Sequence, residues 1–150
     1  MPDYFVKPSC NMATNISTIN INAPIERVWA ALTDPELVKK WQYGSVLTTD
    51  WQPGSEIRFR TEWEGQVFEQ WGIVLEMVPF ELIKYSLFAP RPGLEDKAEN
   101  YFVMNYILSD SHGAVKLEII QQDDRPGAVQ EDPHGEENPI LHGLKILLEV

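Results

Sequence analysis

The stretch that decides the fold is ININAPIERVWAALTDPELVKKW, residues 19 to 41. It opens at the end of an alternation of apolar and polar side chains that runs from Ile16 to Asn22 and is typical of a half-buried strand. Pro24 follows, with apolar residues three and four positions apart, which predicts a short amphipathic helix. Asp34-Pro35-Glu36 has the residue types of an N-cap and first turn, so a second helix is expected directly after the first.

Beyond this stretch the hydrophobic period changes from about 3.6 to 2. The separators between the alternating runs are short and rich in Pro and Gly, as in Pro53-Gly54 and Glu64-Gly65, and such turns join antiparallel neighbours. A longer loop is expected from Ala89 to Asn100. The predicted strands are Val46 to Asp50, Glu56 to Trp63, Gln66 to Met77, Glu81 to Phe88, Tyr101 to Leu108 and Ala114 to Gln121.

The two ends of the chain differ in character. Residues 1 to 13 are irregular and are expected to form a flexible N-terminal tail, with one domain over residues 14 to 150. Residues 122 to 138 are rich in Asp, Glu, Pro and Gly, so we expect a polar loop that moves and is placed to gate a cavity. From Pro139 onward the apolar residues predict a C-terminal helix with one face that needs covering.

The order of elements is one strand, two short helices, six strands and a C-terminal helix, which predicts an α+β fold. A seven-stranded antiparallel sheet twists and curls, and the last helix can then lie in its concave face. A gap between helix and sheet would be a mostly apolar pocket, the usual form of a small-molecule site.

Composition and net charge disfavour several classes of partner and site. The 150 residues make one domain, and 43% hydrophobic with 23% charged residues is typical of a globular protein. Twelve Lys and Arg against 23 Asp and Glu give a net charge of −11, which disfavours nucleic acid and anionic membranes as partners. No apolar run is long enough to insert across a bilayer, so we expect a cytoplasmic protein. The single Cys10 and three scattered histidines predict neither an internal disulfide nor a zinc site, and no cofactor is predicted.

The opening stretch resembles the signature of the START-like, or SRPBCC, superfamily. Within it the chain is most similar to the branch named after activators of heat-shock protein 90 ATPase homologues, through Pro53-Gly54, the segment Gly72 to Pro79 and the ending Leu141 to Glu149. The resemblance implies the helix-grip fold, in which the C-terminal helix closes a hydrophobic cavity over the sheet. It also raises a chaperone as a partner. Many relatives open the last helix with a Gly-Trp pair, whereas Glu136 to Pro139 stands here, so the cavity mouth is expected to differ.

Three sets of side chains are candidates for lining such a cavity. By alternation, Phe59 and Trp63 share one strand face, Glu69 and Trp71 another, and Phe102 and Tyr106 a third, and the sequence leaves open which faces point inward. Glu69 either lies in the cavity or pairs with Arg58 or Arg60 in solvent, and His142 either faces the ligand or stands exposed on the last helix. The expected lining residues are Phe59, Trp63, Glu69, Trp71, Tyr85, Phe102, Tyr106, Leu141, His142 and Lys145.

Three functions remain open on this scaffold. The first is a module that binds a lipid-like or polycyclic hydrophobic small molecule, as a carrier or sensor. The second is a protein-interaction domain related to chaperone activators, with homodimerisation as a further option, and it predicts an exposed apolar patch. The third is a cyclase or hydrolase that uses Glu69, His142 or a tyrosine as acid or base. No nucleophile, base and orienting residue stand together in a recognisable pattern, so the sequence favours a function without catalysis.

Overall fold

The computed structural model describes residues 13–42, 44–111, 113–125, 127–135 and 137–149. Within them, one antiparallel sheet of seven strands has the order β1-β7-β6-β5-β4-β3-β2. The strands are β1 (Ala13–Ile21), β2 (Val46–Thr48), β3 (Glu56–Trp63), β4 (Gln66–Val78), β5 (Leu82–Leu87), β6 (Phe102–Ser111) and β7 (Ala114–Asp123). The helices are α2 (Ile25–Thr33), α3 (Pro35–Trp41), α4 (Pro139–Leu148) and the short 3-10 helix η2 (Ala98–Asn100).

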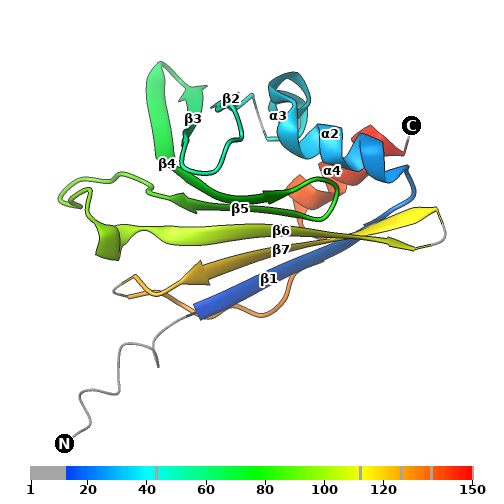
Figure 1. Cartoon of the computed structure of the whole chain (residues 1–150). Helices are drawn as coiled ribbons and strands as arrows, with labels where there is room; N and C mark the ends of the chain where they lie inside the picture. Colours follow the sequence, from blue (N-terminus) through cyan, green and yellow to red (C-terminus); the bar gives the residue numbers. More distant parts are fainter. Residues whose placement is uncertain (1–12, 43, 112, 126, 136, 150) are drawn as a thin grey trace, which may run out of the picture.

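The sheet curls around the C-terminal helix, which confirms the predicted α+β class and the helix-grip fold. Figure 1 shows β3 and β4 rising at one end of the sheet, beside the group formed by α2, α3 and α4. The predicted strands all form, although β1 begins at Ala13 and β2 already ends at Thr48. The predicted tail lies outside the described residues except for Ala13.

The two short helices form as their sequence predicts. The side chain of Asp34 accepts a hydrogen bond from the Glu36 amide at 3.0 Å, and Pro35 occupies the first turn of α3, where no amide is needed. The indole of Trp41 then donates to the Ala31 carbonyl at 2.7 Å, which joins the end of α3 to α2 inside the core. Because this bond is buried, it fixes the angle between the two helices.

Helix α4 covers the concave face of the sheet. Asn138 is its N-cap, and its side chain accepts hydrogen bonds from the Ile140 and Leu141 amides. Leu141, Leu144 and Leu148 are buried, at the three- and four-residue spacing of one helix face. This face packs with α2, α3 and β1 around the central core.

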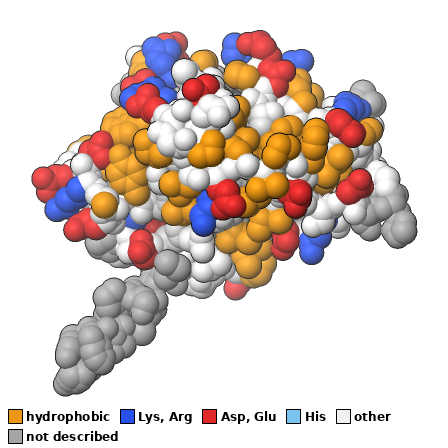
Figure 2. Space-filling view, viewed as in Figure 1, with side chains coloured by type: hydrophobic (Ala, Val, Ile, Leu, Met, Phe, Trp, Pro, Cys, Tyr) orange, Lys and Arg blue, Asp and Glu red, His pale blue; other side chains and the backbone are white. Residues whose placement is uncertain are grey.

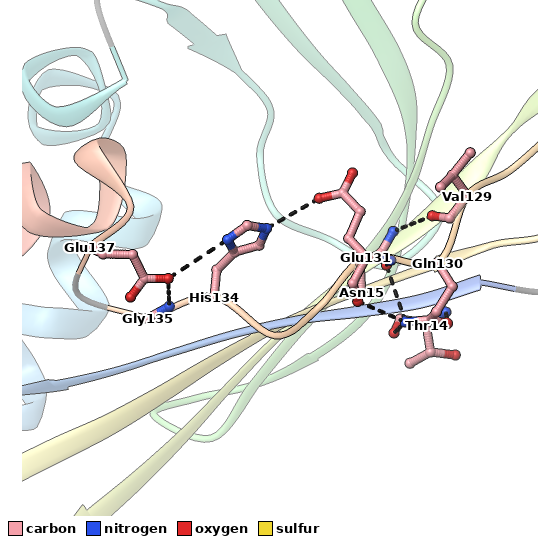
Figure 3. Close-up of polar contacts among 8 residues, drawn as sticks. All are labelled: Thr14, Asn15, Val129, Gln130, Glu131, His134, Gly135 and Glu137. Atoms are coloured by element: carbon pink, nitrogen blue, oxygen red, sulfur yellow. Dashed lines mark hydrogen bonds and ion pairs between the residues drawn. The ribbon is translucent and has the colours of Figure 1, made fainter.

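The polar segment before α4 is held against the outer edge of β1. We call residues 129–134 the strap. The Thr18 amide donates to the His134 carbonyl at 2.9 Å, and the His134 amide donates to the Ile16 carbonyl at 2.9 Å. Figure 3 shows the side-chain contacts that extend this pairing: Gln130 bonds both the amide and the carbonyl of Thr14 through its own amide group. The expected loop is therefore joined to the edge of β1 by one isolated β-bridge, between Ser17 and His134, and by side-chain hydrogen bonds.

Gly72 marks the bend in β4. A Cβ atom at this position would stand 1.8 Å from the Ser86 carbonyl oxygen, so no side chain fits between β4 and β5 there. The register between the two strands shifts a little further on, between Val74 and Glu76. A glycine and a bulge together let the strand turn sharply, and this curvature lifts the β3–β4 hairpin away from the plane of the other strands.

Candidate functional site: a cavity between the sheet and helix α4

An open cavity of about 510 Å³ lies on the concave face of the sheet. Strands β3 to β7 form its floor, and the end of α3 and the start of α4 form its roof. This volume falls in the range of ordinary small-molecule sites. Its walls are Gln42, Ser45, Phe59, Thr61, Phe68, Gln70, Tyr85, Leu87, Phe102, Met104, Tyr106, Gln121 and Ile140.

Two tyrosines form the polar centre of the cavity. The hydroxyl groups of Tyr85 and Tyr106 are 2.7 Å apart, and their rings meet edge to face with centroids at 5.7 Å. Phe59 packs on Tyr85 at 5.9 Å. Burial raises the pKa of Tyr85 well above its ordinary value and raises that of Tyr106, so both phenols stay neutral at physiological pH.

A second cavity of about 380 Å³ continues the first toward the strap. The two share Gln42, Met104, Tyr106, Gln121 and Ile140 as walls. At the far end of the second cavity, His134 Nε2 is 3.2 Å from a carboxylate oxygen of Glu131, as Figure 3 shows. The strap therefore forms one end of the second cavity, and its side chains are more polar than those that line the first cavity.

Half of the sequence-predicted residues lie at these two cavities. Phe59, Tyr85, Phe102 and Tyr106 line the first cavity, and Leu141 lines the second. The four aromatic residues come from three strands, and alternation along each strand turns them to the same side as the helices.

The other five lie elsewhere. Trp63 ends β3 at the tip of the hairpin and is 66% exposed. Glu69 and Trp71 lie on the opposite, outer face of β4, where they border a separate hollow of about 500 Å³. His142 is exposed on α4. Lys145 donates to the Asn20 carbonyl and to Glu149, each at 2.7 Å, and so joins α4 to the end of β1.

The outer face explains the position of Glu69. Arg58 lies between Glu56 at 3.1 Å and Glu69 at 3.5 Å, and its guanidinium packs over the Trp71 ring at 5.0 Å from the centroid. Trp71 also donates to Asp96 at 3.0 Å. The structure thus separates Glu69 from His142 by the thickness of the sheet, and it does not bring the two together as an acid–base pair.

Several cavity residues escaped the sequence reasoning. Gln42, Gln70 and Gln121 supply amide groups to the walls, and Phe68 and Ile140 supply apolar surface at the open side. Alternation from Val74, whose burial marks the inner face, would have placed Gln70 and Phe68 there. Gln42 and Ile140 stand at helix ends, where no periodic pattern assigns a direction.

No metal-binding cluster and no membrane-spanning helix occurs in the part of the chain that the structure describes. No group of three or more His, Cys, Asp or Glu side chains in it is arranged to hold a metal ion. Of its helices, none has both the length and the apolar character that a membrane span requires.

Comparison with known proteins adds a family and a fold. The family model described as "Activator of Hsp90 ATPase homolog 1-like protein" matches residues 22–149. A protein from Cytophaga hutchinsonii with a solution structure is 33% identical, with 89% of this chain and 93% of that one covered and a TM-score of 0.68. A crystal structure from Chromobacterium violaceum is 25% identical, with 91% and 98% covered and a TM-score of 0.69.

More distant neighbours share the fold alone. A crystal structure from Nitrosomonas europaea is 17% identical, with 91% of this chain and 94% of that chain covered and a TM-score of 0.68. Among curated proteins, none matches the chain.

Proposed function

Because the chain belongs to the family of activator of Hsp90 ATPase homolog 1-like proteins, whose fold commonly holds hydrophobic ligands, we propose that it binds a lipid-like or polycyclic hydrophobic small molecule and serves as a carrier or sensor in the cytoplasm. The observation that carries the proposal is the open, aromatic-lined cavity of about 510 Å³ under α4. A concave, mostly apolar hollow of this size with a few polar groups is the usual form of a small-molecule site, and this one has the helices above it and the aromatic face of the sheet below it.

Native mass spectrometry of the purified protein, followed by extraction under denaturing conditions, tests this function. We expect an adduct near one per chain that is released as a hydrophobic compound. Met104 lines both cavities, so Met104→Trp should fill the hollow and leave the chain without adduct. Val103 precedes it on β6 and by alternation faces outward, so Val103→Trp is the matched control and should keep the adduct. A wild-type chain that carries no adduct and does not bind hydrophobic dyes would contradict the proposal.

A second candidate is a protein-interaction domain, and one observation favours it. Val67, Ile73 and Leu75 share the outer face of β4 and are 50%, 41% and 43% exposed. We call these three residues the outer stripe. Figure 2 shows that hydrophobic side chains gather across the middle of the visible face of the molecule, with acidic and basic side chains among and around them. Exposed apolar surface of this kind marks contact sites on many proteins, whether for a chaperone or for a second copy of the chain.

Threonine at all three positions of the outer stripe separates the two candidates, because threonine has a high strand propensity and removes apolar surface. If the stripe binds a chaperone of the Hsp90 class, stimulation of that ATPase should be lost in the triple variant and kept in Met104→Trp. If the stripe binds a second copy, the mass measured by light scattering should fall from two chains to one in the triple variant. If the wild-type chain is a monomer and does not stimulate the ATPase, the outer stripe binds neither partner, and ligand binding remains as the proposed function.

A further inference from the structure

The charge of the cavity walls restricts the ligand. Among the residues that line the first cavity, all of them described, none carries a charge, although the whole chain has a net charge of −11. In the second cavity the ionisable side chains besides the neutral Tyr106 are Glu131 and His134, and the last two face one another at 3.2 Å. A charged ligand group would therefore lose its hydration without meeting an opposite charge in the centre of the hollow.

Cationic side chains near the hollow already have partners. Arg125 packs its guanidinium 4.3 Å from the centroid of the Phe102 ring, but it also binds the Asp123 carboxylate through Nε at 2.8 Å and through Nη2 at 2.6 Å. Lys145 binds Glu149. Arg58 lies on the outer face. An anionic head group would have to break one of these ion pairs or remain unpaired, so the hollow disfavours carboxylates, sulfonates and phosphates.

The tyrosine pair offers one hydrogen bond to a ligand. Each phenol has one donor, and the contact of 2.7 Å between the hydroxyl groups uses the donor of only one of them. Whichever tyrosine donates, the second O–H is not used within the pair, and on the side of Tyr106 the Gln42 side chain also hydrogen-bonds the phenol. Gln42 and Gln121 stand beside Tyr106 in both cavities and add amide groups of either polarity.

We infer that the ligand is uncharged and carries a hydrogen-bond acceptor, such as a ketone, ether or ring oxygen, on an aromatic or alicyclic framework that brings this acceptor to the Tyr85–Tyr106 pair. The inference rests on the proposed function and narrows its ligand class, because it excludes fatty acids and other anionic amphiphiles as the native ligand.

Two fluorescent dyes that share the same ring system test whether the cavity prefers an uncharged ligand. N-phenyl-1-naphthylamine is neutral, and 8-anilinonaphthalene-1-sulfonate differs from it by a sulfonate. We expect the neutral dye to bind at least about tenfold more tightly. Its binding should be lost in Met104→Trp, which shows that the dye occupies the cavity and not the outer stripe. Equal or tighter binding of the sulfonate in the cavity would overturn the inference.

Displacement of the neutral dye by 2-acetylnaphthalene and by 2-ethylnaphthalene tests whether a hydrogen-bond acceptor strengthens binding. The two compounds differ only by a carbonyl group in place of a methylene. The double variant Tyr85→Phe/Tyr106→Phe removes both hydroxyl groups at once, so neither is left buried without a partner and the fold is retained. The preference for the ketone over the hydrocarbon should fall about fivefold in this variant. Tyr101→Phe, which removes a hydroxyl that binds Asp96 outside the cavity, should leave the preference unchanged.

The outcomes separate the inference from the proposed function. Binding of both naphthalenes with an unchanged preference in the double variant would overturn the role of the tyrosine pair and leave ligand binding intact. Failure of the neutral dye and of both naphthalenes to bind the wild-type chain would overturn the proposed function, and the inference with it.

Discussion

At the scale of single residues, Gly72 is the position where β4 and β5 leave no space for a side chain. A Cβ atom there would lie 1.8 Å from the carbonyl oxygen of Ser86 and 2.6 Å from its carbonyl carbon. Both atoms belong to the backbone, so relief requires the strands to separate. We expect Gly72→Ala to lower the free energy of unfolding by about 3 kcal/mol, measured by urea denaturation.

Gly143 provides the matched control for that experiment. It lies inside α4, and a Cβ atom built on it meets nothing within 4 Å. Gly143→Ala should therefore stabilise the chain by about 0.5–1 kcal/mol, because alanine is the better helix former. Equal effects of the two substitutions would show that the close approach at Gly72 does not limit stability.

Asp123 makes the stability of the fold depend on pH. The Arg125 guanidinium, which donates two hydrogen bonds to its buried carboxylate, holds the pKa of Asp123 below its ordinary value. The unfolded chain therefore takes up this proton first, so the contribution is present above pH of about 3.9 and is lost as the pH falls through the folded pKa. Asp123→Asn should cost about 2 kcal/mol at pH 7, and this cost should shrink as the pH falls below about 3.9 and vanish below the folded pKa of Asp123.

Urea denaturation at a series of pH values measures this difference. Glu62→Gln is the control, because the Arg60–Glu62 pair at 2.8 Å is exposed, and its loss should change the free energy of unfolding by less than about 0.5 kcal/mol at any pH. A cost for Asp123→Asn that does not change between pH 7 and pH 3 would contradict the assignment.

Individual site residues were only partly predictable. The sequence showed that Glu69 and Trp71 share a face, but both faces of β4 carry large apolar residues, Phe68 and Val74 on one and Trp71 and Ile73 on the other. Alternation divides such a strand into two faces without saying which is inside. The direction is decided by register with β3 and β5 and by the position of α4, and these are long-range contacts.

At the scale of elements, the strap depends on Asn15. The side chain of Asn15 donates to the Val129 carbonyl at 3.2 Å and accepts from the Glu131 amide at 2.7 Å (Figure 3). Asn15→Ala should release the strap locally, and amide hydrogen exchange at Glu131 and His134 should accelerate about fivefold. Unchanged exchange at both amides would show that the remaining bonds to β1 suffice.

Asn20 is the control for the strap experiment. It is an exposed asparagine on the same strand, beyond the segment that the strap contacts. Asn20→Ala should leave exchange at Glu131 and His134 at the wild-type rate.

Elements with local signals were predicted well, and the strap was predicted as a loop without its contacts to β1. Strand β3 and the turn that follows it have the bounds that alternation and Glu64-Gly65 indicated. The strap has a polar, irregular sequence, and it is held in part by side-chain amides of Asn15 and Gln130, which stand 115 positions apart. Neither periodicity nor propensity predicts a contact between residues so far apart in the sequence. The segment was therefore predicted as a loop without partners.

At the scale of the whole molecule, a ligand in the cavity should stabilise the fold as a whole. A neutral ligand at a hundred times its Kd adds about 2.7 kcal/mol to the free energy of unfolding, which raises Tm by several degrees in a domain of this size. Scanning calorimetry with 2-acetylnaphthalene measures the shift. Met104→Trp should show none, and a shift of the same size in that variant would place the ligand outside the cavity.

The overall fold was predictable because the order of elements and the family resemblance agree on one architecture. The resemblance implied a cavity, but its size and openness were not predictable, since the volume depends on which side chains meet across the gap between α4 and the sheet. Thr61 and Gln70, for example, fill less of that gap than the aromatic residues beside them. Sequence patterns indicate that a position faces inward, but they do not sum side-chain volumes across distant strands.

The pairing between the strap and β1 has a consequence for the behaviour of the protein at high concentration. A nine-residue strand at the border of a sheet presents free main-chain groups that can recruit a strand from another molecule. The amide of Thr18 and the carbonyl of Ile16 are occupied by His134, and both main-chain groups of Thr14 are occupied by Gln130. At the opposite border β2 is only three residues long. The strap thus occupies hydrogen-bonding groups along the edge of β1, and we expect its loss to expose them to strands of other molecules.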